Sequence, residues 1–87
     1  MKISEYLKQK DNVDILAQQD KLLSTIEINP EVMDGLPCIR GTRIPVYIIL
    51  ELLQEGHTFE AIIKEYPNLS RDRIKAALHF AALVASL

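Results

Sequence analysis

The feature that most constrains this chain is the segment 37–45, P-C-I-R-G-T-R-I-P, which runs directly into an apolar stretch at residues 46–53. Each proline fixes its own φ, and a proline at the first position of a helix costs no hydrogen bond. Gly41, between Arg40 and Arg43, is free to take a positive φ. The segment therefore predicts a rigid, cationic turn that leads into an apolar helix.

The first predicted helix covers residues 45–55, with Pro45 at its first position and Gly56 as its C-terminal stop. Its apolar residues cover most of the helix circumference: Val46, Ile48, Ile49, Leu50, Leu52 and Leu53. A helix of this kind must be buried by other elements of the chain or by a second subunit. It is the expected centre of the core.

Two more helices are predicted, at residues 59–65 and 71–85, with Thr58 and Ser70 as their N-caps. Pro67 disfavours helical geometry at the residue before it and so ends the first of them. The expected inner stripe of the last helix is Ile74, Ala77, Leu78, Ala81 and Ala85. Further apolar residues near the C-terminus exceed what one face requires, which suggests a dimer contact.

Short strands are predicted at residues 25–28, where polar and β-branched apolar residues alternate, and at residues 36–39. Asp34-Gly35 is a turn dipeptide between them. Residues 1–24 have loosely spaced apolar residues and predict either one or two short helical turns or a mobile arm. The expected organisation is this N-terminal segment followed by a single domain over residues 25–87.

Composition narrows the class of protein. The 87 residues carry a net charge of −2, far from the basic charge of an autonomous DNA-binding domain. One cysteine allows no intramolecular disulfide, no apolar run reaches the length of a membrane span, and no signal-peptide pattern is present. These observations predict a cytoplasmic protein without membrane association.

The sequence does not predict an enzyme, a cofactor or a metal site. It has no paired carboxylates, glycine-rich phosphate loop or nucleophile motif. Cys38, between Pro37 and Ile39, is expected to be a buried and unreactive thiol. His57 and His79 have no metal-ligand spacing and are expected to be ordinary surface or half-buried side chains.

Three helices of these lengths, with a short connector between the last two, have the proportions of a helix-turn-helix unit. The strings G-L-P-C-I-R-G-T-R-I-P-V (residues 35–46), L-L-Q-E-G (52–56) and Y-P-N-L-S (66–70) resemble the DUF433 family. The resemblance covers about residues 26–82. It implies a mainly α fold: a three-helix, homeodomain-like helix-turn-helix core preceded by short β-strands.

The resemblance also implies a function. Members of the family often look like antitoxins of type II toxin–antitoxin modules, paired with PIN-like ribonuclease toxins. We therefore expect a non-catalytic antitoxin-like protein that binds operator DNA as a homodimer and neutralises such a toxin. The alternative is a homo-oligomeric interaction module of unknown function without DNA affinity, which the near-neutral charge favours.

Arg71, Arg73 and Lys75, in the first turns of the last helix, and Lys64 before it are the candidate DNA contacts. The N-terminal part of the second helix of such a motif meets base edges, so Arg71 could read guanine while Lys64 or Lys75 holds phosphate. Positive charge at a helix N-terminus opposes the macrodipole, which hints at an external anion. The alternative is an ordinary solvated polar face.

Arg40 and Arg43 flank the glycine turn and are expected to project near one another. They could clamp a phosphate of DNA or a carboxylate of a partner, because a guanidinium binds both with two hydrogen bonds. In the alternative, one arginine binds loop carbonyls and the other pairs with Glu31 or Asp34, so that both hold the irregular segment together.

Overall fold

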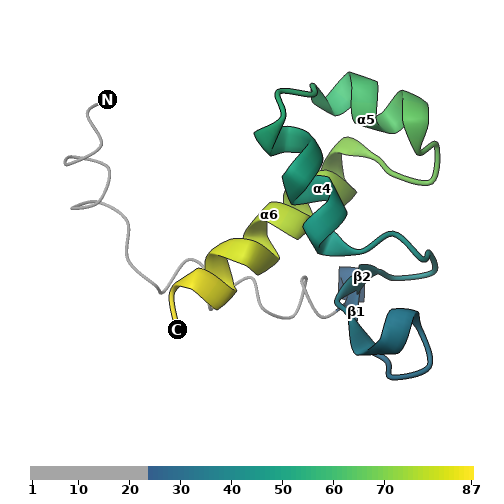
Figure 1. The fold of residues 1–87 in the computed structure, drawn as a ribbon, viewed down its shortest axis with the longest axis vertical. Helices are drawn as coiled ribbons and strands as arrows, with labels where there is room; N and C mark the ends of the chain where they lie inside the picture. Colours follow the sequence, from purple (N-terminus) through teal and green to yellow (C-terminus); the bar gives the residue numbers. More distant parts are fainter. Residues whose placement is uncertain (1–23) are drawn as a thin grey trace.

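The computed structural model describes residues 24–87 and is mainly helical (Figure 1). Its elements in chain order are β1 (Ile26–Glu27), a 3₁₀ turn η1 (Met33–Gly35), β2 (Cys38–Ile39), α4 (Val46–Gln54), α5 (Phe59–Glu65) and α6 (Arg71–Ala85). The predicted bounds of the three helices are confirmed to within one residue. The predicted arm or short helices at residues 1–24 lie outside the described residues except for Ser24, which is helical together with Thr25.

The two strands form a minimal antiparallel pair in which Ile26 lies opposite Ile39 and Glu27 opposite Cys38. Each strand is two residues shorter than predicted. Thr25 is helical rather than extended, and the chain leaves the sheet after Glu27, ahead of the turn at residues 29–32. Pro37 has no N–H to donate to a partner strand, so pairing begins only after it.

The turns between these elements use residues in the left-handed region of φ. Asp34 and Gly35 have φ values of 58° and 86°, which confirms the predicted turn, and Gly41 has a φ of 79°. The hydroxyl of Thr42 holds the second turn, because it donates to the carbonyl of Ile39 at 2.7 Å and accepts from the Ile44 N–H at 3.1 Å. The segment 37–45 is thus a fixed turn rather than a loose loop.

α4 begins one residue later than predicted. Pro45 is its extended N-cap, with a ψ of 148°, and lies opposite Cys38 as a continuation of the strand pairing. The helix ends in a Schellman arrangement around Gly56: the N–H of Gly56 binds the carbonyl of Leu53, and the N–H of His57 binds that of Leu52. Gly56 adopts the positive φ that this ending requires, at 94°.

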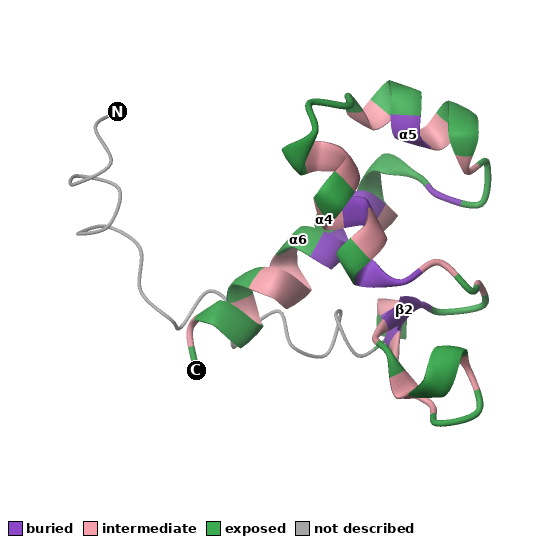
Figure 2. Cartoon of the chain, viewed as in Figure 1, coloured by how far each residue is buried: buried purple, intermediate pink, exposed green. Residues whose placement is uncertain are grey.

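α4, α5 and α6 pack against one another in pairs, and β1 lies against α6. Their contact encloses isoleucines that are almost completely buried: Ile39, Ile49, Ile62 and Ile74. Figure 2 shows the buried residues gathered where α4, α6 and β2 meet. Each such side chain contributes about 2 kcal/mol by its removal from water, so this small cluster holds the domain together.

Burial stops short of what the sequence predicted. Only Val46 and Ile49 are buried among the nine residues of α4. The inner stripe of α6 ends at Ala77, and its expected continuation at Leu78 and Ala85 is exposed. Figure 1 shows the C-terminal end of α6 extending away from α5. This half of the helix is only partly covered by residues 24–87: Phe80 and Ala81 are half-buried, whereas Val84 is exposed.

None of the helices in residues 24–87 is both long and apolar enough to cross a membrane.

Candidate functional site

Four cationic side chains lie on α5 and at the start of α6, and we call them the cationic face: Lys64, Arg71, Arg73 and Lys75. Two hydroxyls position the helices that carry them. Thr58 accepts from the N–H of Ala61 at 3.1 Å, and Ser70 accepts from the N–H of Arg73 at 3.2 Å. Both predicted N-caps are therefore confirmed.

The two arginines of the cationic face bind other parts of the same chain. Arg71 forms an ion pair with Glu60 of α5, and its guanidinium lies over the ring of Phe59 at 4.9 Å from the centroid. Arg73 donates to the carbonyl of Asn68 in the connector at 2.7 Å. Both arginines therefore tie α6 to the elements before it.

The two lysines differ from the arginines. Lys64 and Lys75 are exposed, and within residues 24–87 neither forms a hydrogen bond or an ion pair. Acidic side chains are also exposed on α5 and α6, namely Glu60, Glu65 and Asp72. The cationic face is accordingly a mixed surface with two unengaged ammonium groups.

Arg40 is bound within the chain by several contacts, three of which define its position. Its Nε donates to the carbonyl of Ser24 at 3.1 Å, its Nη2 to that of Ile26 at 3.3 Å, and its Nη1 lies 3.3 Å from the carboxylate of Glu27. Arg40 is thus the arginine that binds backbone carbonyls in the structural alternative, and it pairs with Glu27 as well. The pairing expected for the other arginine, with Glu31 or Asp34, does not form within residues 24–87.

Arg43 has a different environment from Arg40. It is exposed, and no contact within the described part of the chain engages its guanidinium. Strand pairing explains the difference, because the antiparallel register puts Glu27 opposite Cys38, two residues before Arg40. Arg43 lies three residues further along, on the turn beyond the pair of Glu27 and Cys38, where no acidic side chain in residues 24–87 lies opposite it in the sheet.

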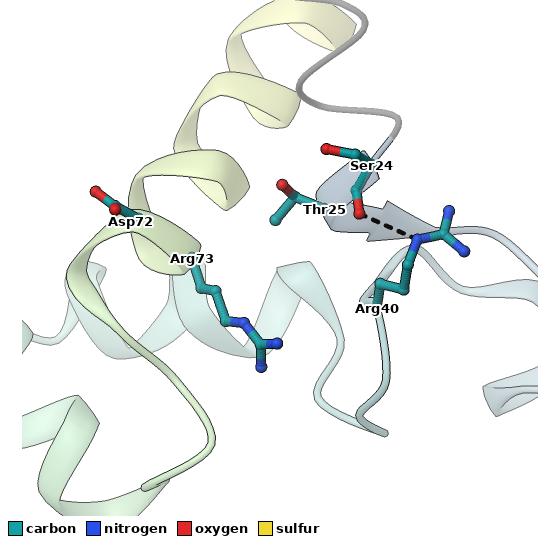
Figure 3. Close-up of a pocket in the computed structure, with 5 residues that line it drawn as sticks. All are labelled: Ser24, Thr25, Arg40, Asp72 and Arg73. Atoms are coloured by element: carbon teal, nitrogen blue, oxygen red, sulfur yellow. Dashed lines mark hydrogen bonds between the residues drawn. The ribbon is translucent and has the colours of Figure 1, made fainter.

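Arg40 shares a hollow of about 200 Å³ with Arg73, and the other lining residues are Ser24, Thr25 and Asp72 (Figure 3). In this view the carboxylate of Asp72 points away from Arg40, and the dashed line marks the bond from Arg40 to the Ser24 carbonyl. Both guanidinium groups already bind carbonyl oxygens of the chain. The hollow is therefore a junction between β1 and the start of α6.

Cys38 is completely buried, as predicted, and its Sγ donates to the carbonyl of Leu36 at 3.3 Å. Burial raises the pKa of the thiol above its ordinary value, and the negative charge of Glu27 raises it further. The thiolate is the reactive form of cysteine, so this environment suppresses nucleophilic chemistry at Cys38.

The histidines stand apart from one another on the surface of the fold. His57 is exposed, with Nε2 3.8 Å from Oε2 of Glu55, and His79 is half-buried on α6. Among residues 24–87, no three histidine, cysteine or acidic side chains lie together as metal ligands would.

A second hollow was not predicted as a site. It has a volume of about 290 Å³ and lies between the first half of α4 and the second half of α6, and we call it the apolar groove. Its large lining side chains include Leu36, Tyr47, Leu50, Phe80 and Val84. In the sequence, only the excess of apolar residues on both helices indicated this hollow. The periodicity of each helix could not show where on the surface that excess would lie.

Comparisons with known proteins place this geometry in a family. Residues 26–81 match the family model described as "Protein of unknown function (DUF433)". The crystal structure of a DUF433 member protein from Anabaena variabilis superposes with a TM-score of 0.65 at 28% sequence identity, over 94% of this chain and 88% of that chain.

One relative is considerably longer than this chain. The chain is 30% identical over 71 residues to the uncharacterized protein y4eO of Sinorhizobium fredii, a match that covers 82% of this chain and 31% of that protein. The chain thus spans about a third of the length of this relative. Because the family model matches most of the described residues, the chain belongs to the DUF433 family.

Proposed function

We propose that this protein is a cytoplasmic, non-catalytic antitoxin-like protein that binds operator DNA as a dimer. The DNA-binding unit would be a homeodomain-like helix-turn-helix made of α5, its connector and α6. The observation that carries the proposal is the pair of exposed lysines, Lys64 and Lys75, whose ammonium groups have no partner within residues 24–87. Unengaged ammonium groups on α5 and in the first turns of α6 suit the phosphates that flank a DNA groove.

Arg71 would read a base edge in this proposal, which requires it to leave Glu60. That ion pair is exposed on both sides, and exposed pairs are worth at most about 1 kcal/mol. Leaving the ring of Phe59 adds about 0.5–1 kcal/mol, so the exchange costs about 2 kcal/mol or less. Arg73 would stay on the Asn68 carbonyl and hold the connector in place. Arg71 would thus read the base, while Arg73 would hold the connector in position.

The test is a salt titration of binding to the DNA upstream of the protein's own coding region. We expect the logarithm of the binding constant to fall linearly with the logarithm of salt concentration. Lys64→Ala and Lys75→Ala should each reduce that slope by about 1, because each removes one phosphate contact. Lys64→Arg and Lys75→Arg are the matched controls and should keep the slope. No binding at low salt would overturn the proposal.

The second half of the proposal is neutralisation of a PIN-like ribonuclease toxin. Arg43, exposed on its turn, is the arginine available for an acidic groove of such a partner. If the neighbouring reading frame encodes a small protein with several dispersed aspartates, the two proteins should purify together, and this chain should suppress the ribonuclease activity of that protein. Retained ribonuclease activity in the mixture would reject the partnership.

A homo-oligomeric interaction module without DNA affinity is the second candidate. Two observations favour it: the apolar groove, and the acidic Glu60, Glu65 and Asp72 beside the lysines of the cationic face. It predicts self-association together with a complete absence of DNA binding at low salt.

A further inference from the structure

The apolar groove is open although its walls are made of large apolar side chains. Leu36, Tyr47 and Val84 are 41%, 48% and 52% exposed and rise around a hollow of about 290 Å³. Among residues 24–87, no charged side chain lines the hollow. A hollow and projecting apolar side chains thus occur on one patch, which is what a surface needs to fit a copy of itself across a two-fold axis.

The charge pattern of α6 indicates which occupant suits the groove. After Lys75 the chain has no Asp, Glu, Lys or Arg up to its last residue, Leu87, and His79 is the one titratable side chain of that stretch. A two-fold contact brings a surface near its own copy, so any formal charge close to the axis repels itself. A surface without charges avoids this repulsion and offers nothing specific to an acidic or basic partner.

The burial pattern of α4 agrees with this interpretation. Its sequence is apolar on most of its circumference, but the fold of residues 24–87 buries only Val46 and Ile49. Tyr47 and Leu50 face the groove together with Phe80 and Val84 of α6. The exposed apolar side chains of α4 and α6 therefore lie together at the groove. A single contact with another molecule can thus cover both.

We propose that two copies of this chain pack together through the apolar groove, with Val84 of each copy seated in the groove of the other. This inference names the surface of the dimer assumed in the proposed function. It depends on that dimer but not on DNA binding. The contact excludes water from Leu36, Tyr47 and Val84 and leaves the cationic face at the other end of α6 uncovered.

The test is sedimentation velocity of the full chain without DNA. We expect the wild-type protein to be a dimer and Val84→Glu to be a monomer, with a dissociation constant raised at least about a hundredfold, because the contact would bury unpaired carboxylates. Ala82→Glu is the matched control: residue 82 is exposed on the same helix and does not line the groove. This variant should remain dimeric.

A charge-pairing experiment shows whether the occupant is a second copy. Val84→Glu and Val84→Lys should each be monomeric alone and should form a mixed dimer when combined, because opposite charges then meet across the contact. A monomeric wild-type chain, or a Val84→Glu variant as dimeric as Ala82→Glu, would overturn the proposal. A wild-type dimer that fails to bind DNA would overturn only the DNA-binding function.

Discussion

Arg40 and Arg43 have the same chemistry and flank the same glycine, yet they differ in what they do for the fold. Arg40 joins its turn to the carbonyls of Ser24 and Ile26 and to Glu27. These three acceptors match the fixed fork of a guanidinium, and a single ammonium cannot bind all of them in the same geometry. Arg43 has no such acceptors within residues 24–87.

Arg40→Lys should therefore lower the free energy of unfolding by about 1 kcal/mol, mainly through the lost bonds to the two carbonyls. The ion pair with Glu27 adds little because Arg40 is half exposed and water screens the charge. Arg43→Lys is the control on the same turn and should change stability by less than about 0.5 kcal/mol. Urea unfolding followed by circular dichroism measures both, and equal effects of the two substitutions would contradict the assignment.

The environment of Cys38 gives a dependence of stability on pH. Burial, and then the charge of Glu27, raise the pKa of its thiol in the folded state above the ordinary value of 9.0. The unfolded state therefore loses its thiol proton first as the pH rises past 9.0, which favours unfolding. Below that pH both states keep the proton, and Cys38 has no effect on the pH dependence.

Cys38→Ala should remove this contribution. The wild-type free energy of unfolding should fall more steeply than that of the variant above pH 9.0, by up to about 1.4 kcal/mol per pH unit. The comparison with the variant separates the thiol from lysines and tyrosines that titrate in the same range. Urea unfolding curves at a series of pH values provide the measurement, and parallel pH profiles for the two proteins would show that the thiol titrates normally.

At the scale of the elements, the start of α6 depends on one hydroxyl. Ser70 accepts the N–H of Arg73 and so satisfies one of the free donors in the first turn of the helix. The same turn carries Arg71 and Arg73, whose contacts orient α6 against α5 and the connector. A change at Ser70 should therefore affect the helix that joins the cationic face to the core.

Ser70→Ala should lower the free energy of unfolding by about 1 kcal/mol, since alanine cannot accept the Arg73 N–H. Ser70→Asp is the matched control, because a carboxylate caps as well as a hydroxyl and also suits the helix dipole. Thermal unfolding followed by circular dichroism at the helical minimum should rank aspartate near serine and above alanine. Equal losses for the two variants would exclude a capping role.

The helix ends were predictable from the sequence because their causes are local. The caps Thr58 and Ser70 and the stop at Gly56 act within a few residues, so spacing alone identifies them. The partner of Arg40 was not predictable in this way. Glu27 precedes it by 13 residues and reaches it only through the register of two strands that are two residues long each.

For the whole molecule, the sequence predicted a mainly helical fold and the approximate positions of β1, β2, α4, α5 and α6, but not the 3₁₀ helix η1 or the helical conformation of Ser24 and Thr25. It did not show which apolar residues would remain uncovered. Periodicity placed Leu78 and Ala85 inside, but both side chains are exposed in the structure. Burial at those positions depends on where other helices end in space, which no pattern along one helix contains.

α6 is a single helix of 15 residues without a break, so it is about 22 Å long and stiff on the scale of a DNA groove. Its cations stand at one end and its uncharged surface at the other. A pairing of two copies at the uncharged ends therefore determines both the distance and the rotation between the two cationic ends. If the proposed dimer binds DNA as proposed, it should bind two half-sites only at one spacing and on one side of the double helix, and pairs of half-sites that are half a helical turn out of phase should bind poorly.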